Sequence, residues 1–152
     1  MKLEREASQQ TRFWNPTDPA DWIETHFYIP ELHGPIVLAD YQRRCLREAL
    51  RKDASGNFVY STIVWSDIKK SAKSTIAAAV ANYVAWHTAW GNIYMVANDL
   101  QQADSRVGYY ARRAVELNPD MARVVKIRPS GYYMEFPNRT FKIGRASCRE
   151  RV

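Results

Sequence analysis

Hydrophobic positions in the first third of the chain recur at helical spacing. Pro19 to Phe27 predicts a short helix with Trp22, Ile23 and His26 on one side. Apolar residues recur with the same period between Tyr41 and Arg51, which predicts a second helix. The sequence before and between these helices contains Asn15-Pro16, Pro30 and Gly34-Pro35, which favour turns.

The middle of the chain alternates strand-like and helix-like patterns. Phe58 to Trp65 is β-branched and aromatic, so it predicts a strand, and Ile93 to Ala97 predicts another. A polar, basic stretch from Ser66 to Ala72 follows the first strand. Lys73 to Trp90 is rich in alanine and apolar on nearly all sides, which predicts a buried helix. A further helix is predicted from about Leu100 to Leu117, with Asp99 as its cap.

The last third predicts more strands. Arg123 to Ile127 predicts a strand. Tyr132 to Phe136 and Arg139 to Ile143 flank Pro137-Asn138, which predicts a hairpin. Strands that alternate with helices favour an α/β fold with a mostly parallel sheet.

Composition adds exclusions to this outline. The chain has 152 residues, 46% of them apolar and 25% charged, which suits one globular domain. Ile76 to Trp90 is interrupted by polar residues and is too short for a bilayer span, and the polar start does not resemble a secretory signal. The two cysteines, Cys45 and Cys148, lie in no metal-binding or disulfide pattern. The cytoplasm is therefore the expected compartment.

The end of the chain reads as an artefact. Residues 143–152 are Ile-Gly-Arg-Ala-Ser-Cys-Arg-Glu-Arg-Val, the direct translation of a common sequencing-library adapter. A chance match over this whole stretch is very improbable, so we exclude it from the fold argument. Without it the basic residues fall from 22 to 19 and the acidic ones from 16 to 15, which lowers the net charge from +6 to +4.

This mild positive charge leaves two interpretations open, a solvated basic surface and a DNA-contacting patch. Excluding the tail also leaves Cys45 as a lone thiol on a predicted helix. We expect this side chain to fill a core or half-buried position.

The stretch from Asp67 to Thr75 carries the candidate chemistry. Against the phosphate-binding pattern G-x-x-x-x-G-K-[ST], Lys73 and Ser74 match, whereas Asp67 and Ala72 replace the two glycines. Its place between a predicted strand and a predicted helix is the one this chemistry requires, because backbone N–H groups and the helix N-terminus then face the anion. Lys73 would reach the outer phosphates and Ser74 would join a Mg²⁺ shell. The alternative is a basic loop with a solvated Lys73.

The loop has a specific resemblance. Lys69-Lys-Ser-Ala-Lys-Ser-Thr75 resembles the Walker A loop Arg-Lys-Asn-Gly-Lys-Ser-Thr of phage large terminases. Upstream, Trp22-Ile-Glu24 and Leu38-Ala-Asp-Tyr-Gln42 are similar to that family's Trp-Ile-Glu and Leu-x-x-Trp-Gln segments. Downstream, the resemblance continues through three further segments, Ile93–Ala97 with Gln101-Gln-Ala103, Asn118-Pro119, and Gly131 to Ile143. It covers about residues 20–142.

The resemblance implies an incomplete P-loop NTPase domain of the RecA/ASCE type, a three-layer sandwich, at residues 36–142. Residues 1–35 precede it as an N-terminal segment, and 143–152 are the artefactual tail. It also implies a nucleotide site formed by Ser71, Ala72, Lys73, Ser74 and Thr75, with ATP and Mg²⁺ as cofactors and Ser74 as the Mg²⁺ ligand. One of Lys69 and Lys70 corresponds to the basic residue that stabilises the γ-phosphate, a catalytic role shared with Lys73.

By the same resemblance, Gln42 contacts the adenine edge and Tyr41 packs beside it. The alternative from burial patterns alone is that Tyr41 lies in the core and Gln42 on the surface.

The implied function is that of the N-terminal part of a DNA-packaging ATPase. Its partners would be double-stranded DNA, the portal and the small terminase subunit, with a homo-oligomeric ring in the intact protein and no membrane, in the cytoplasm of the bacterial host. No apolar strand ending in Asp-Glu occurs in the sequence, so we expect this chain to bind nucleotide weakly and to hydrolyse it poorly. Another P-loop ATPase, such as a helicase-like protein, and a non-catalytic nucleic-acid-binding module are the alternatives.

Overall fold

A computed structural model describes residues 18–97, 104–129 and 133–146. The first helix, α2 (Pro19–His26), begins where Asp18 accepts hydrogen bonds from the N–H groups of Ala20 and Asp21. Trp22 and Ile23 are buried, so the predicted helix and its apolar side are confirmed.

A short hairpin and a second helix follow. Strands β1 (Tyr28–Ile29) and β2 (Gly34–Pro35) pair antiparallel, and α3 (Asp40–Ala49) comes next. The α3 helix packs against α2, to which it is tied by the Arg43–Glu24 and Arg47–Asp18 ion pairs. Only a narrow apolar stripe of α3 faces inward, so Cys45 is exposed and its predicted core or half-buried position is wrong.

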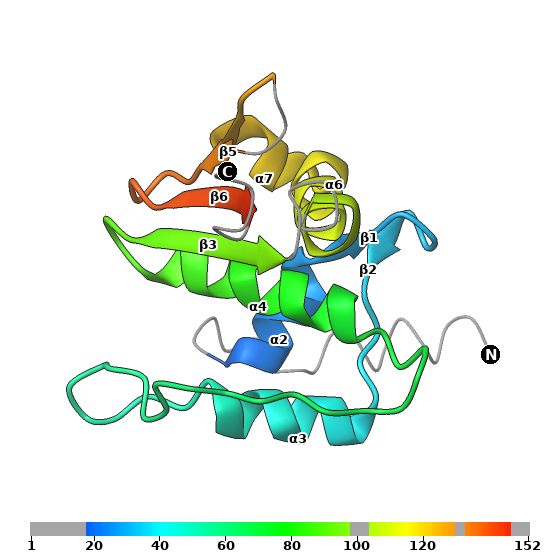
Figure 1. Ribbon diagram of the computed structural model, residues 1–152, viewed down its shortest axis with the longest axis vertical. Coiled ribbons are helices and arrows are strands. Elements are labelled where there is room, and N and C mark those ends of the chain that lie inside the picture. Colours follow the sequence, from blue (N-terminus) through cyan, green and yellow to red (C-terminus); the bar gives the residue numbers. More distant parts are fainter. Residues whose placement is uncertain (1–17, 98–103, 130–132, 147–152) are drawn as a thin grey trace, which may run out of the picture.

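Helix α4 (Lys73–His87) lies at the centre of the molecule (Figure 1). Its buried residues include Ile76, Tyr83 and Asn82, and the Asn82 side chain donates to the Ala111 carbonyl at 3.0 Å. The prediction of a largely buried helix is confirmed, although the helix ends at His87 rather than at Trp90.

The larger sheet has four strands in the order β3-β6-β5-β4. The strands are β3 (Asn92–Ala97), β4 (Lys126–Ile127), β5 (Tyr133–Glu135) and β6 (Phe141–Ala146). Only β3 and β6 pair parallel, whereas β6-β5 and β5-β4 pair antiparallel. The helix-and-strand class is confirmed, but a mostly parallel sheet is wrong for the described residues, because the hairpin around Pro137-Asn138 reverses the chain beside β6.

Between β3 and β4 the described residues are helical from Asp104 to Val124 with one break at Asn118. A π-helical turn, η1 (Asp104–Gly108), leads into α6 (Tyr109–Leu117), and α7 (Pro119–Val124) follows at once. The predicted 100–117 helix is therefore confirmed over its second half, and its first residues and Asp99 lie outside the described part. The predicted strand at 123–127 shrinks to Lys126–Ile127, because the Asn118 cap and Pro119 start a helix that uses Arg123.

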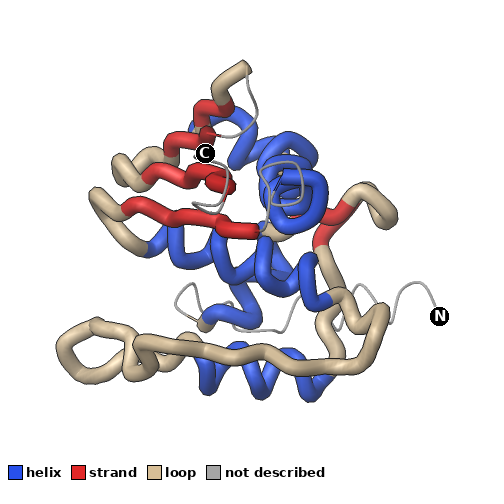
Figure 2. The backbone as a smooth tube through the Cα atoms, in the orientation of Figure 1, coloured by secondary structure: helices blue, strands red, loops and turns tan. Residues whose placement is uncertain are grey.

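The predicted strand Phe58–Trp65 is not a strand in the structure. It runs extended along α3 as loop (Figure 2), and only Phe58 forms an isolated bridge, to Lys52. Ile63 and Trp65 face a cavity between α3 and α4 that Leu46 and Ile76 also line. The sequence fits a strand, yet within the described ranges no neighbouring strand lies beside it to supply hydrogen bonds.

Residues 143–146 complete β6, where they pair with Tyr94–Ala97. The assignment of 143–152 to an artefactual tail stays a prediction. In the part of the chain that the structure covers, no helix is long and apolar enough to cross a membrane.

Candidate functional site

The basic loop predicted to bind phosphate lies between the extended segment and α4. Ser71 N–H donates to the Ile68 carbonyl at 3.3 Å, which closes a turn. Lys70 and Ala72 have positive φ angles of 69° and 61°, a conformation that glycine adopts far more readily. Ala72 is the N-cap of α4 and its side chain offers no acceptor to the first N–H groups of the helix. The loop therefore presents backbone N–H groups next to several cations.

Lys73 folds back over this loop. Its Nζ donates to the Asp67 carbonyl at 2.9 Å and to the Ile68 carbonyl at 2.5 Å. Because Lys73 is half-buried and its ammonium bonds to two carbonyl oxygens, its side chain does not extend freely into solvent.

Gln42 connects α3 to the loop. Its Oε1 accepts from the Ala39 N–H at 2.9 Å, and its Nε2 lies 3.5 Å from the Ser71 carbonyl oxygen, a long hydrogen bond. The side chain is only 9% exposed, so the surface alternative for Gln42 is wrong.

Tyr41 also connects α3 to the loop, but at Asp67 rather than at Ser71. It is 42% exposed, so the core alternative is wrong, and its hydroxyl donates to Asp67 Oδ2 at 2.9 Å. The pKa of Asp67 is lowered, first by the hydrogen bond from the Ile68 N–H and then by that from Tyr41. The same bond raises the pKa of Tyr41. Asp67 thus remains an ionised acceptor that ties the start of the loop to α3.

One cleft brings most of the predicted site residues together. It has a volume of about 670 Å³, and Gln42 lies at one side of it. Its lining from the loop and α4 is Lys69, Lys70, Ala72, Lys73, Ser74 and Thr75. Tyr41 and Ser71 are not among the residues that line it.

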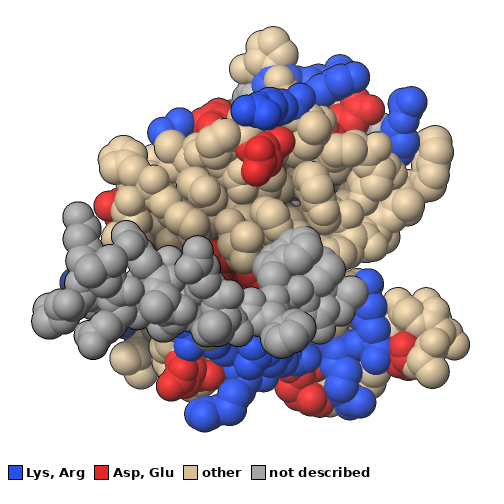
Figure 3. All heavy atoms as spheres, turned by 180° about the vertical axis from the view of Figure 1, so that it is seen from behind, with Lys and Arg blue, Asp and Glu red and all other residues tan. Residues whose placement is uncertain are grey.

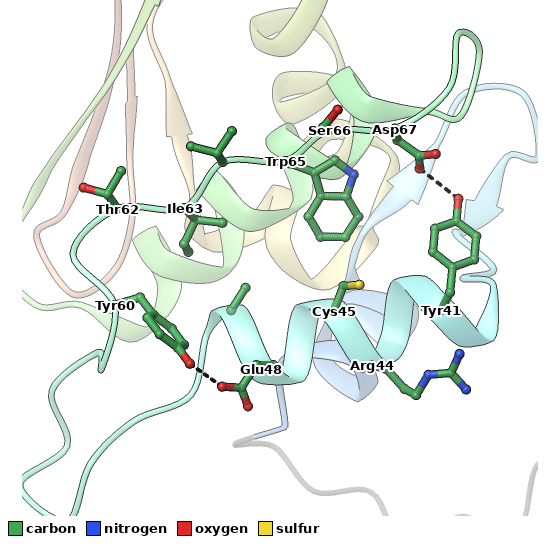
Figure 4. A pocket seen from close by; sticks show the side chains of 12 residues that line it. Tyr41, Arg44, Cys45, Glu48, Tyr60, Thr62, Ile63, Trp65, Ser66 and Asp67 are labelled. Carbon is green, nitrogen blue, oxygen red and sulfur yellow. Dashed lines mark hydrogen bonds between the residues drawn. The ribbon is translucent and has the colours of Figure 1, made fainter.

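Tyr41 instead lines a second groove of about 620 Å³ between α3 and the extended segment. Figure 4 shows Tyr41 turned toward Asp67 at one end and Tyr60 toward Glu48 at the other, with the Trp65 ring facing α3. Tyr41 and Gln42, which the resemblance places together at the adenine, therefore line two different cavities.

Two residues with polar side chains in the first cleft were not predicted. Glu31 comes from the turn between β1 and β2 and Tyr110 from α6, and the Tyr110 hydroxyl donates to Glu31 Oε1 at 2.9 Å. They stand 79 positions apart, so no local sequence pattern links them.

Oxygen donors that Mg²⁺ could meet in this cleft include the Ser74 hydroxyl and the Glu31 carboxylate. Within the described ranges no group of three or more His, Cys, Asp or Glu side chains could hold a metal. The Mg²⁺ site at Ser74 stays a prediction.

Charge on the surface is mixed rather than basic throughout. On the face in Figure 3, lysine and arginine side chains gather toward both ends and alternate with acidic ones. Several arginines of α3 and α6 are paired with carboxylates, among them Arg43, Arg47 and Arg113. This pattern favours the solvated-surface interpretation of the net charge.

Comparisons with known proteins give one informative result. No family model matches the chain, and no curated protein matches it. Among solved structures it is similar to the large terminase of bacteriophage HK97, with a TM-score of 0.74 and 19% identity over 92% of this chain. The chain spans 29% of that protein's length. The predicted resemblance is thus confirmed at the level of the fold: this chain folds like part of a phage large terminase.

Proposed function

We propose that this chain is the N-terminal part of the ATPase of a terminase large subunit, and that it binds ATP with Mg²⁺ in the cleft beside Lys73. The observation that carries the proposal is the convergence of Gln42, the loop lysines and the start of α4 on one cleft. The terminase-like fold supports it, because the loop stands in the matching kind of framework.

In this proposal the loop residues divide the nucleotide between them. Lys73 leaves its carbonyl contacts for the β- and γ-phosphates, and backbone N–H groups of residues 71–75 hold the remaining phosphate oxygens. Lys69 or Lys70 offsets the charge of the γ-phosphate, and Ser74 contributes one oxygen to Mg²⁺. Gln42 meets the base, whereas Tyr41 acts through Asp67 on the position of the loop.

Hydrolysis needs more than this cleft supplies. P-loop ATPases use an Asp for Mg²⁺ and a Glu to activate water at the end of a second strand. Residues that follow the strand-like segments here are Ser-Asp-Ile, Asn-Asp-Leu and Arg-Pro-Ser. We therefore expect nucleotide binding without efficient turnover, and steady hydrolysis by the purified chain at the rate of an intact motor would contradict this.

We further propose that the intact protein is the DNA-packaging motor itself, a ring acting on double-stranded DNA at a portal with a small terminase subunit. In it, additional strands beside residues 58–65 would complete the P-loop sandwich. The gene sequence beyond codon 142 tests this. Continuation into an apolar strand ending in Asp-Glu supports it, whereas a native gene that encodes residues 143–152 and stops contradicts it.

Calorimetric titration tests the nucleotide site directly. We expect ATP with Mg²⁺ to bind the wild-type chain, and Lys73→Ala to weaken binding by at least tenfold, since a charge-assisted contact contributes about 1.5–3 kcal/mol. Lys52→Ala is the matched control, because Lys52 lies over the Phe58 ring, away from the cleft. Equal affinities of wild type and Lys73→Ala would refute the site.

A further inference from the structure

The cleft contains an acidic residue that the phosphate site does not use. Glu31 and Tyr110 line the same cleft as Lys73 and Ser74, although they come from the β1–β2 turn and from α6. Their hydrogen bond of 2.9 Å joins these two elements across the cleft wall.

A carboxylate in this place calls for an explanation. It repels phosphate, so the group it meets on a bound ligand is a hydrogen-bond donor or a cation. Glu31 Oε1 accepts from Tyr110, and across the described ranges no other hydrogen bond or ion pair involves Glu31. An ionised carboxylate accepts several hydrogen bonds, so Oε2 remains available to a ligand.

The surroundings of Glu31 indicate which donor this is. The hairpin that carries it contributes apolar side chains to the cleft, namely Ile29, Leu32, Ile36 and Val37. The cleft thus has a cationic part, formed by the loop lysines, and an apolar wall that carries one carboxylate. A nucleoside triphosphate offers a charged chain, a hydroxylated sugar and a flat base, and carboxylates hold ribose hydroxyls in other nucleotide folds.

Tyr110 holds the Glu31 carboxylate in place by donating a hydrogen bond from its protonated hydroxyl group. The hydrogen bond to Glu31 raises the pKa of Tyr110, and the Thr75 side chain opposes this rise. Tyr110 lines the cleft together with Glu31 and with Ser74 and Thr75 of the first turn of α4. This arrangement sets the carboxylate relative to the phosphate loop.

We propose that Glu31 accepts a hydrogen bond from a ribose hydroxyl of the bound nucleotide, with Tyr110 as the residue that positions it. This inference rests on the proposed function, since it assigns the sugar subsite of the same cleft.

Titration calorimetry with ATP and 2′,3′-dideoxy-ATP, both with Mg²⁺, tests the inference. We expect the wild-type chain to prefer ATP about tenfold, since bonds to charged groups contribute more than neutral ones. Glu31→Gln should reduce the preference to about twofold, and Tyr110→Phe should give an intermediate value. Glu48→Gln is the matched control, because Glu48 accepts from Tyr60 in the other groove.

The outcomes separate this inference from the function on which it rests. If ATP does not bind, or Lys73→Ala leaves binding unchanged, the proposed function fails. If binding depends on Lys73 while wild type and Glu31→Gln share one ribose preference, only the role of Glu31 is refuted. A Glu31→Gln variant that changes the Mg²⁺ requirement but not the ribose preference would also overturn it, by assigning the carboxylate to the metal. Circular-dichroism melts of each variant confirm that it folds.

Discussion

Three single residues of the site, Ala72, Gln42 and Tyr41, adopt a backbone conformation or a degree of burial that their residue types alone do not predict. Ala72 stands where the phosphate-loop pattern has glycine, and the structure gives it a left-handed φ of 61°. Gln42 and Tyr41 exchange the positions that burial preferences alone assign them. Tyr41 bonds to Asp67 at the start of the loop, and Gln42 bonds both to Ala39 at the start of its own helix and to Ser71 of the loop. Side-chain hydrogen bonds over such sequence distances leave no periodic signal, so pattern analysis does not find them.

The strained alanine leads to a prediction. Ala72→Gly should raise the free energy of unfolding by up to about 1 kcal/mol, because relief of left-handed strain outweighs the added entropy of the unfolded chain. ATP should also bind more tightly, since no Cβ then restricts the approach of phosphate. Urea unfolding and calorimetry measure the two effects.

Ala77→Gly is the control for this change, since Ala77 lies exposed inside α4 and the same replacement there should cost about 1 kcal/mol. If both glycine variants lose stability equally, the strain at Ala72 is not relieved and the explanation fails.

At the level of elements, the sequence pattern predicted α2, α3, α4 and α6 and the hairpin around Pro137-Asn138, although β6 continues to Ala146, beyond the predicted Ile143. Its errors have identifiable causes. Phe58–Trp65 has strand composition but no strand neighbour among the described residues. Helix α7 begins at the Asn118 cap and Pro119 and includes Arg123 and Val124, which the sequence assigned to a strand. Residue propensity thus indicates whether a segment is extended or helical. Whether an extended segment becomes a strand depends on a pairing partner, and where a helix begins depends on its cap.

The Asn138 side chain connects the turn between β5 and β6 to the end of α4. Its Nδ2 lies within 2.9 Å of the carbonyl oxygens of Ala85, Trp86 and Thr88 at the end of α4. Asn138→Ala should lower the free energy of unfolding by about 1–2 kcal/mol, since it leaves these carbonyls without this donor. Thermal or urea denaturation measures it, with the exposed loop variant Asn57→Ala as control. If Asn138→Ala loses no more free energy of unfolding than Asn57→Ala, the Asn138 hydrogen bonds do not stabilise the fold.

At the scale of the whole molecule, large apolar side chains remain exposed on two elements. Val64 on the extended segment is 87% exposed and Val96 on β3 is 67% exposed. Two cavities of about 450 and 220 Å³, the first lined by β3 and the second by Ile63 and Trp65, share Ala77 and Val80 of α4. Unpaired edges and apolar faces of this kind promote association.

We therefore expect the chain to be marginally stable and to self-associate as its concentration rises. The double variant Val64→Lys/Val96→Lys should shift sedimentation toward monomer without a loss of stability, whereas Ser55→Lys in the exposed loop should not. A wild-type monomer that melts cooperatively at high temperature would contradict this expectation.

Amide chemical-shift mapping during an ATP and Mg²⁺ titration locates the bound nucleotide directly. If nucleotide binds at the loop beside Lys73, we expect shifts concentrated at Lys69–Thr75 and Gln42, little change around Tyr60 and Glu48, and loss of the response in Lys73→Ala. Shifts confined to the groove between α3 and the extended segment, or no shifts at all, would contradict it.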